Sequence, residues 1–342
     1  MVPNSISKGC WAVERLRWGM LGAAGIGDRD VIPALLASET AELIGIASRD
    51  LEKAKRKSEQ YGLPKAYGSY EDMLADPEIE AVYIPLPNHL HKPWTIAAAR
   101  AGKHVLCEKP IALNAAEAQE MADVCREAGV HLAEAFMYRH HPRIARAKEI
   151  LRSGEIGQLR AIHGVFTYNG AGNTGDIRHN AEWGGGGVFD VGCYPLSAAR
   201  YFTGEEPEAV TVQAKFSPEH GGVDMMASGL VEFPGGVSLT FDCGMWAAFR
   251  NTLEIVGSEG RILLDPSFLP GADNDSITVV TTDGERREGP YGVNAYILQA
   301  DQFARTVRGL EPAAFPAEDA VAGMRLLEAC LNSARHKTRA VL

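Results

Sequence analysis

The sequence has no apolar run that approaches the roughly 20 residues needed to cross a membrane. Its first stretch, MVPNSISKGCWAVERLR, also lacks the apolar segment of a secretory signal peptide. From these two absences we expect a protein of the cytoplasm.

Basic charge is in deficit. The chain has 34 Lys and Arg against 44 Asp and Glu, which gives a formal net charge of -10 at pH 7. Nucleic acids and anionic membranes are bound by surfaces with net positive charge, so neither is expected as a partner. A soluble enzyme or binding protein with a small-molecule ligand remains.

Cysteine is scarce and scattered. The six cysteines form no CxxC pair, and no histidine cluster has the spacing of a metal site. This pattern favours reduced, buried thiols over a disulfide framework or a zinc centre, so no structural metal is expected. The adjacent His140 and His141 would diverge on a regular element. A surface or capping role is therefore favoured for them over metal binding.

The length of 342 residues and the hydrophobic content of 46% are enough for two domains with buried cores. The first half alternates short apolar runs, such as ELIGIAS and AVYIPL, with helical patterns that end at Gly62, Gly102 and Gly129. This alternation is typical of βαβ units. We expect an α/β domain with a Rossmann doubly wound parallel sheet over residues 17–137, preceded by a loosely ordered tail of residues 1–16.

The second half changes character. Runs such as LRAIHGVFTY, EAVTVQAKF and VSLTFDCGM follow one another, and FPGGV at residues 233–237 is a hairpin signal. We expect an α+β domain over residues 138–342 with a large, open, mostly antiparallel sheet. The final helical pattern, AEDAVAGMRLLEACLNSARHK, is expected to pack back on the existing layers.

A glycine-rich turn, GAAGIG, follows the first expected strand. Gly22 permits a tight turn, Ala24 is small enough for a pyrophosphate to approach the backbone, and Gly27 permits close helix packing. With Gly25 and Ile26, these residues form the expected dinucleotide site. Asp28 is discordant there, because a carboxylate competes with a bound pyrophosphate.

The ribose selector is expected at the end of the second strand, in GIASRD. Enzymes that use NAD carry an acid there, whereas Ser48 and Arg49 match the 2′-phosphate of NADP. NADP is favoured over NAD. In the alternative, Arg49 is a surface residue and Asp50 is the ribose acid rather than only the N-cap of the next helix.

Two further strand ends place polar groups at the same edge of the sheet. YIPLPNHLH ends one strand and CEKP ends the next, so Lys109 is expected beside the reacting carbon, held by Pro110 through a cis bond. The expected nicotinamide-side contacts are Leu86, Pro87, Asn88, His91, Glu108 and Lys109.

Together, GAAGIG, ASRD, AVYIPLPNHLH, AGKHVLCEKP and GGGGVFDVGCY resemble the Gfo/Idh/MocA oxidoreductases over almost the entire chain from Trp18. DIR at residues 176–178, YFTGEEP and FPGGV are most similar to the branch of glucose-fructose oxidoreductase, D-xylose dehydrogenases and dihydrodiol dehydrogenases. That branch mostly uses NADP. The resemblance implies catalytic roles for Lys109, Asp190 and Tyr194. Inositol dehydrogenases carry histidine where this chain has Tyr194, which argues against that activity.

The sequence pattern around Asp190 and Tyr194 indicates the same catalytic residues. VFDVGCYPLSAARYF is expected to form a helix after Gly184–Gly187, with Asp190 and Tyr194 on one face at i and i+4. Pro195 is expected in its first turn or at a kink. The alternatives are a packed Tyr194 and an Asp190 that only caps the helix. Arg178 is expected either to clamp a pyrophosphate or substrate hydroxyl, or to form a surface ion pair.

The expected function is NADP-dependent hydride transfer to or from a sugar or cyclic diol, with an aldose such as D-xylose or glucose favoured. Tyr194 is expected to take the hydroxyl proton, with its pKa lowered by Lys109. Trp183 and Phe166 are candidate pocket walls, whereas helix packing is favoured for Trp94. Alternatives are a dihydrodiol dehydrogenase, a keto-sugar reductase or a non-catalytic NADP-binding regulator. A homodimer or homotetramer is expected through the second sheet.

Overall fold

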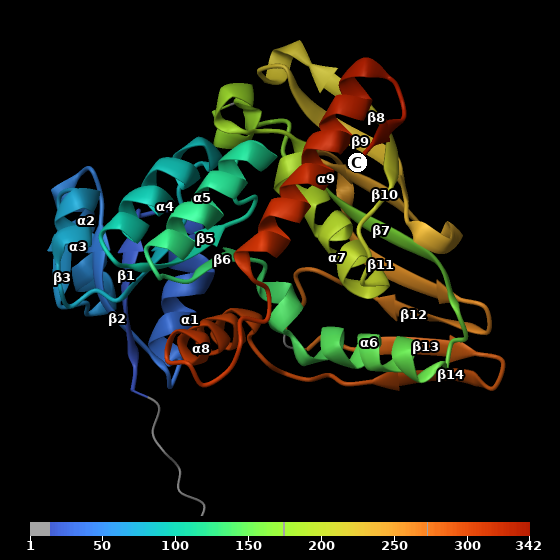
Figure 1. Ribbon diagram of the computed structural model, residues 1–342, viewed down its shortest axis with the longest axis horizontal. Helices are drawn as coiled ribbons and strands as arrows, with labels where there is room; N and C mark the ends of the chain where they lie inside the picture. Colours follow the sequence, from blue (N-terminus) through green and yellow to red (C-terminus); the bar gives the residue numbers. More distant parts are fainter. Residues whose placement is uncertain (1–13, 174, 272) are drawn as a thin grey trace, which may run out of the picture.

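The computed structural model describes residues 14–173, 175–271 and 273–342, which form two sheets with helices between and around them (Figure 1). The expected loose tail of residues 1–16 lies mainly outside the described residues. Its last residue already belongs to the first strand, because β1 begins at Leu16.

The first sheet is parallel, with strand order β3-β2-β1-β4-β5-β6. Its order reverses between β1 and β4, which makes this the point where a doubly wound sheet opens a ligand crevice. The strands are β1 (Leu16–Leu21), β2 (Ala41–Ala47), β3 (Lys65–Tyr67), β4 (Ala81–Ile84), β5 (His104–Glu108) and β6 (Leu132–Ala135). The connecting helices are η1 (Gly27–Val31), α1 (Ile32–Ala37), α2 (Leu51–Tyr61), α3 (Tyr70–Ala75), η2 (Asn88–Leu90), α4 (His91–Arg100) and α5 (Ala115–Glu127).

The predicted helix ends are confirmed. Gly62, Gly102 and Gly129 have φ values of 67°, 71° and 68°, in the left-handed region where glycine carries no Cβ penalty. Asp50 caps α2 by accepting a hydrogen bond from Lys53 N. His141 caps α6 (Pro142–Ser153) in the same way, through Arg143 N, which confirms the capping role favoured for it.

The second sheet has strand order β14-β13-β12-β11-β7-β10-β9-β8-β15. Only β10 and β7 pair in parallel among its described strands, so the expectation of a mostly antiparallel sheet is confirmed. The strands are β7 (Leu159–Asn169), β8 (Ala209–Ser217), β9 (Val223–Glu232), β10 (Ser238–Gly244), β11 (Trp246–Gly257), β12 (Gly260–Leu264), β13 (Ile277–Thr281), β14 (Gly284–Glu288) and β15 (Ala340–Val341).

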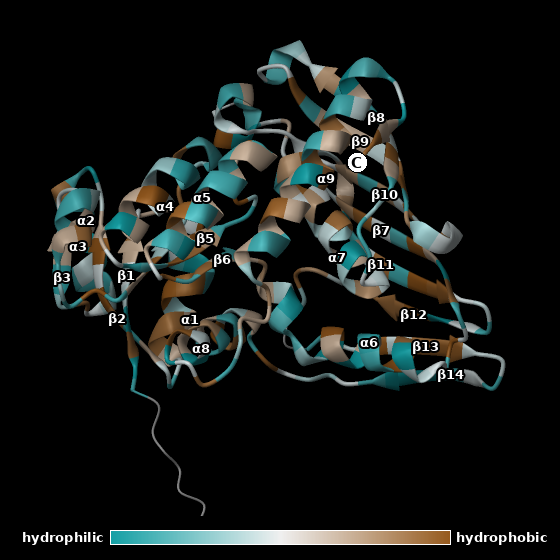
Figure 2. Cartoon of the chain, in the orientation of Figure 1, coloured by the Kyte–Doolittle hydropathy of each residue, from teal (hydrophilic) through white to brown (hydrophobic). Residues whose placement is uncertain are grey.

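Helices cover one face of this sheet, as Figure 1 shows for α6, α7 (Cys193–Thr203) and α9 (Ala317–His336). Burial alternates along β8 and β9, because successive side chains face the helices and the open side in turn. The hydropathy colouring in Figure 2 shows hydrophobic residues along strands of both sheets. The remaining short helices are η3 (Met137–His140), η4 (Ile177–His179), η5 (Ala181–Trp183), η6 (Val188–Gly192), η7 (Pro218–His220) and η8 (Pro234–Gly236).

The last two helices return to the first sheet. Phe303 of α8 (Ala295–Val307) packs on Trp18 of β1 with ring centroids 5.2 Å apart. Glu328 of α9 accepts a hydrogen bond from Ala115 N, at the start of α5, at 3.2 Å. The end of the chain therefore ties the two sheets together.

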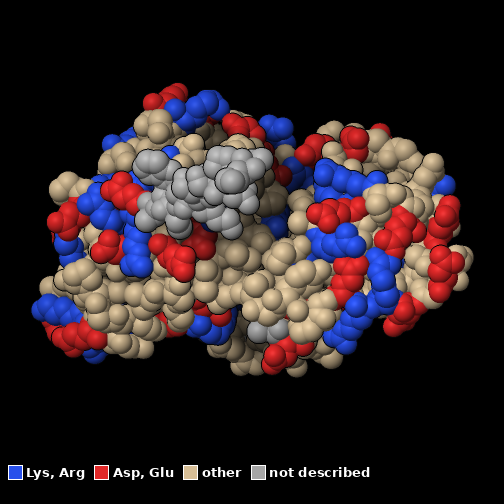
Figure 3. Space-filling model, turned by 90° about the horizontal axis from the view of Figure 1, so that it is seen from below, with Lys and Arg blue, Asp and Glu red and all other residues tan. Residues whose placement is uncertain are grey.

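The surface and the thiols agree with the composition. Acidic and basic side chains are interspersed over the face seen in Figure 3. The five cysteines among the described residues are buried and unpaired, while Cys10 lies outside them. Within the described chain, no helix has the length and apolar character to cross a membrane.

Candidate active site

One cleft joins the turn after β1, the ends of β4 and β5, and the segment that carries η6. Its volume is about 620 Å³. It lies where the order of the first sheet reverses, and β7 and β11 supply its far wall. The expected site residues that line it are Ala24, Gly25, Ile26, Leu86, Pro87, Asn88, Glu108, Lys109, Arg178, Asp190 and Tyr194.

The glycine-rich turn leaves room for an anion. Gly22 has φ of +132°, and a Cβ there would lie 2.8 Å from Leu86 Cδ2. At Gly25 a Cβ would meet no described atom within 4 Å, so the backbone is open on that side. Gly27 begins η1. The discordant Asp28 is explained by an ion pair of 2.8 Å with Lys57 Nζ, which offsets its charge.

The expected ribose selector lies at the end of β2, outside the residues that line the cleft. Ser48 is buried, and its hydroxyl accepts a hydrogen bond from Asp50 N at 3.2 Å. Arg49 is exposed. Asp50 uses Oδ1 to cap α2 at 3.1 Å, so a structural task already occupies that oxygen.

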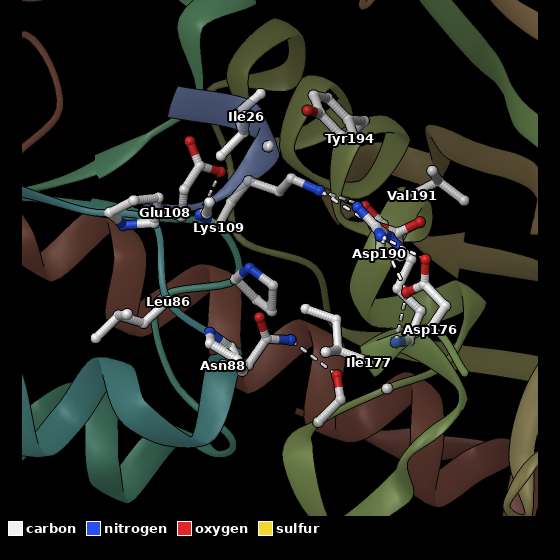
Figure 4. Close-up of a pocket in the computed structure, with 18 of the residues that line it drawn as sticks. Ile26, Leu86, Asn88, Glu108, Lys109, Asp176, Ile177, Asp190, Val191 and Tyr194 are labelled. Atoms are coloured by element: carbon white, nitrogen blue, oxygen red, sulfur yellow. Dashed lines mark hydrogen bonds and ion pairs between the residues drawn. The ribbon is translucent and has the colours of Figure 1, made fainter. Parts of the chain in front are cut away.

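Lys109 extends from the end of β5 towards η6 (Figure 4). The predicted cis bond to Pro110 is confirmed. Its ammonium donates to the backbone carbonyl of Asp190 at 2.6 Å and lies 3.6 Å from Asp190 Oδ1. Burial would lower the pKa of Lys109, but the neighbouring Cys193, Asp190 and Glu108 outweigh that effect and raise the pKa. The ammonium is therefore charged at neutral pH.

Both carboxylate oxygens of Asp190 accept hydrogen bonds inside the cleft. Oδ1 accepts a hydrogen bond from Arg178 Nε at 3.0 Å, and Oδ2 accepts one from the Tyr168 hydroxyl at 2.6 Å. Burial would raise the pKa of Asp190, but the charges of Lys109 and Arg178, with the Tyr168 bond, lower it. Arg178 also pairs with Asp176 at 3.1 Å, so it lines the cleft as a member of an ion-pair chain.

Tyr194 sits in an aromatic cluster, buried apart from 6% of its surface. The rings of Phe136, Tyr138, Phe166 and Phe268 lie 5.2 to 5.8 Å from its ring. Lys109 Nζ lies 4.9 Å from the ring centroid. The expected lowering of its pKa is wrong for this state: burial raises the pKa of Tyr194 well above its ordinary value.

None of the four glycines before η6 has room for a Cβ atom. A Cβ on Gly184 would lie 3.0 Å from Asn88 Cβ, and one on Gly185 would lie 2.3 Å from the Arg178 carbonyl oxygen. At Gly186 it would lie 2.1 Å from Asp224 Oδ1, and at Gly187 it would lie 2.9 Å from Gly244 Cα. The run is therefore a tightly packed turn, and Pro195 follows in the first turn of α7, as expected.

His91, expected among the cofactor contacts, is not among the residues that line the cleft. Its ring is fully buried, with Nδ1 2.9 Å from the Pro110 carbonyl oxygen and Nε2 2.7 Å from the Leu86 carbonyl oxygen. Because both nitrogens are used inside the protein, His91 braces the two strand ends instead of facing the cleft. Sequence spacing could not separate these roles, since His91 opens α4 directly after the cleft residues.

Asn88 and its neighbour join the two sides of the cleft. Asn88 Nδ2 donates to the Gly184 carbonyl at 2.8 Å, and the His89 ring stacks on Trp183 at 5.0 Å. Trp183 and Phe166 line the cleft as predicted. Trp94 instead packs edge-on against Tyr70 at 4.7 Å, which confirms the helix-packing interpretation.

Tyr168 is one of the cleft residues that the sequence analysis does not identify. It lines the cleft and donates a hydrogen bond to Asp190, as Phe166 of the same strand lines the cleft. The signal was available, because residues i and i+2 of a strand share one face and both belong to β7.

Comparisons with known proteins agree with this geometry. The model of an oxidoreductase family with an NAD-binding Rossmann fold matches residues 16–136, and the GFO/IDH/MocA C-terminal domain matches residues 144–263. Over 320 residues the chain is 38% identical to D-xylose 1-dehydrogenase (NADP(+)) 2 of Haloferax volcanii, covering 93% of this chain and 97% of that protein. It is 37% identical to dTDP-3,4-didehydro-2,6-dideoxy-alpha-D-glucose 3-reductase of Streptomyces violaceoruber, covering 85% and 83%.

A solved structure, the aldose-aldose oxidoreductase of Caulobacter crescentus complexed with glycerol, superposes with a TM-score of 0.90 at 28% identity. The match covers 96% of this chain and 100% of the other. With both sheets, the glycine-rich turn and the Glu108–Lys109–Pro110 strand end in place, the chain belongs to the Gfo/Idh/MocA family of oxidoreductases.

Proposed function

We propose that the protein transfers a hydride between NADP and a carbinol or carbonyl carbon of an uncharged sugar or cyclic diol, with an aldose such as D-xylose or glucose favoured. The observation that carries this proposal is one shared cleft. Lys109, Asp190 and Tyr194 line it together with the glycine-rich turn at the sheet's switch point.

The residues present fit a dinucleotide. The open backbone at Gly25 and the amides that begin η1 suit a pyrophosphate. Ser48 and Arg49 at the end of β2 would hold the 2′-phosphate. The name of the Haloferax relative, which includes NADP(+), supports the same choice. When bound, the nicotinamide ring supplies the hydride acceptor or donor.

The chain's own residues handle the proton and the charge. Tyr194 would take the hydroxyl proton during oxidation and return it during reduction. Lys109 has an ammonium fixed by the Asp190 carbonyl, and its remaining N–H groups are available to a substrate oxygen. It would stabilise the negative charge that develops on that oxygen in the transition state.

Charge balance in the cleft favours an uncharged substrate. Among the described residues that line it, Lys109 pairs with Asp190, Arg178 pairs with Asp176 and Asp190, and Arg29 pairs with Asp30 at 2.8 Å. A dTDP-linked sugar, as named for the Streptomyces relative, carries a diphosphate that needs unpaired cations or amides. A free sugar or diol requires only hydrogen bonds, so the keto-sugar reductase is the weaker alternative.

The test is a panel of aldoses, cyclic diols and nucleotide-linked sugars with NADP and with NAD, followed by the absorbance of the reduced nicotinamide. We expect turnover of a free sugar or diol with NADP. Turnover of nucleotide-linked sugars alone would overturn the substrate class. Cofactor binding without any turnover would instead support a regulator, the alternative that does not require Lys109 and Tyr194.

We also propose that the open face of the second sheet forms a dimer or tetramer. Leu230 of β9 and Trp246 at the start of β11 are 38% and 44% exposed, and exposed apolar side chains on a sheet favour association. Light scattering of the eluted protein measures the mass. A monomer at micromolar concentration would contradict this arrangement.

A further inference from the structure

Tyr168 is fixed in place although its hydroxyl faces the cleft. Its ring packs against a small separate core of Val223, Met225 and Met245, which are all at most 3% exposed. The backbone of the next turn also passes close to the ring, since a Cβ added on Gly170 would lie 2.8 Å from Tyr168 Cε2. A tyrosine ring packed in this way presents its hydroxyl at one defined point.

At that point the hydroxyl meets Oδ2 of Asp190. Tyr168 binds Oδ2 at 2.6 Å, whereas Arg178 binds Oδ1 at 3.0 Å. With both oxygens bound from different directions, the carboxylate cannot rotate without breaking a charge-assisted hydrogen bond. Asp190 in turn fixes Lys109, through its carbonyl at 2.6 Å and through Oδ1 at 3.6 Å.

We propose that Tyr168 is a positioning residue for hydride transfer: through Asp190 it holds the Lys109 ammonium at the place where the substrate oxygen binds. This inference rests on the proposed function. Tyr168 does not need to touch the substrate, because the chain of contacts from Tyr168 to Asp190 to Lys109 carries its effect.

The test compares Tyr168→Phe with Tyr67→Phe, a matched control. The Tyr67 hydroxyl also binds a carboxylate at 2.6 Å, that of Asp76, but Tyr67 lies on β3, outside the cleft. Both variants keep the ring. We expect Tyr168→Phe to lower kcat about tenfold or more, the loss typical of a hydrogen bond to a charged group. Tyr67→Phe should keep the wild-type kcat.

A double-mutant cycle separates positioning from a general structural effect. If Tyr168 acts through Asp190, Tyr168→Phe should cause no further loss of kcat in an Asp190→Asn background. An undiminished loss in that background would overturn the proposal, and so would a wild-type kcat for Tyr168→Phe. If the wild-type protein turns over no sugar or diol, the proposed function fails instead.

A measurement without substrate keeps the inference testable in that case. Labelling of Lys109 by trinitrobenzenesulfonate at pH 8, followed by peptide mass spectrometry, reports its free amine. A loosened Asp190 should lower the pKa of Lys109, and a fall of about half a pKa unit would give roughly threefold faster labelling. We expect this for Tyr168→Phe and not for Tyr67→Phe. Equal rates in the two variants would overturn the inference.

Discussion

The ammonium of Lys109 lies over the ring of Tyr194, with Nζ 4.9 Å from the ring centroid. A cation over an aromatic face is attracted to the ring without being fixed by a directional bond. The directional bond goes to the Asp190 carbonyl. Lys109 and Tyr194 can therefore each form a hydrogen bond to one substrate oxygen without depending on the other. Substitutions of the two residues should have separable effects on kcat.

Lys109→Ala should lower kcat strongly while the fold and most of the NADP affinity survive, because the glycine-rich turn and the Ser48–Arg49 pair are untouched. Lys109→Arg should not restore the rate, since a planar, larger cation cannot replace a compact ammonium beside the Asp190 carbonyl. Steady-state kinetics and a fluorescence titration of NADPH binding measure both quantities. A Lys109→Ala variant with more than half the wild-type kcat would remove Lys109 from the mechanism.

Tyr194→Phe should lower kcat by about 10² to 10⁴, the usual contribution of general acid or base catalysis. Because the aromatic cluster keeps its ring, the melting temperature should change little. The raised pKa of Tyr194 keeps the phenol protonated at neutral pH. Oxidation, which needs the base, should therefore speed up as the pH rises, whereas reduction, which needs the acid, should stay level through neutral pH.

The pH profiles of the variant complete that test. Tyr194→Phe should lose the rise in oxidation rate, because it has no phenol to titrate. A near-normal kcat with an unchanged pH profile would mean that another group of the cleft transfers the proton. Asp190 would then be the next residue to substitute.

Arg49→Ala should weaken NADP binding by about tenfold or more and leave NAD binding nearly unchanged, since only the 2′-phosphate loses a charge-assisted hydrogen bond. Asp50→Ala is the neighbouring control. It removes the cap of α2, which should cost about 0.5 to 2 kcal/mol of stability, with a small effect on cofactor choice. Equal weakening of both cofactors by Arg49→Ala would contradict the selector.

Gly186→Ala should destabilise the protein and impair turnover. Gly186 has φ of +115°, and the added Cβ would lie 2.1 Å from Asp224 Oδ1, so the turn that leads into η6 has to move. Gly172→Ala is a matched control, because its Cβ would meet no described atom within 4 Å. Thermal unfolding and kcat should separate the two variants. A Gly186→Ala protein as stable and active as Gly172→Ala would show that the turn tolerates the displacement.

Both sheets and the cis bond before Pro110 could be predicted because they depend on local patterns: strand periodicity, glycine at turns and proline after a strand. The site could be predicted in part. Asp190 and Tyr194 were correctly grouped, but they lie in η6 and α7, so the regular helical face assumed for them is interrupted by a π-helical turn.

The errors concern residues whose surroundings depend on how the folded elements pack together. His91 was expected at the cofactor because it follows a strand end, yet its partners are two backbone carbonyls, at residues 86 and 110. Tyr194 was expected to have a lowered pKa because Lys109 is near. Its burial among Phe136, Phe166 and Phe268 has the larger effect, and that burial depends on the packing of both sheets.

The contact between Asn88 and Gly184 has a consequence for protein engineering. The region of the chain that matches the Rossmann family model is fastened to the rest by this bond, by the stacking of His89 on Trp183 and by the link from Lys109 to Asp190. A chimaera that joined residues 16–136 to the remainder of another family member would cut through all three pairs. The two halves are therefore not interchangeable modules. A successful graft would have to transfer residues 181–190 along with the first sheet, and also α8, whose Phe303 packs on Trp18 of β1.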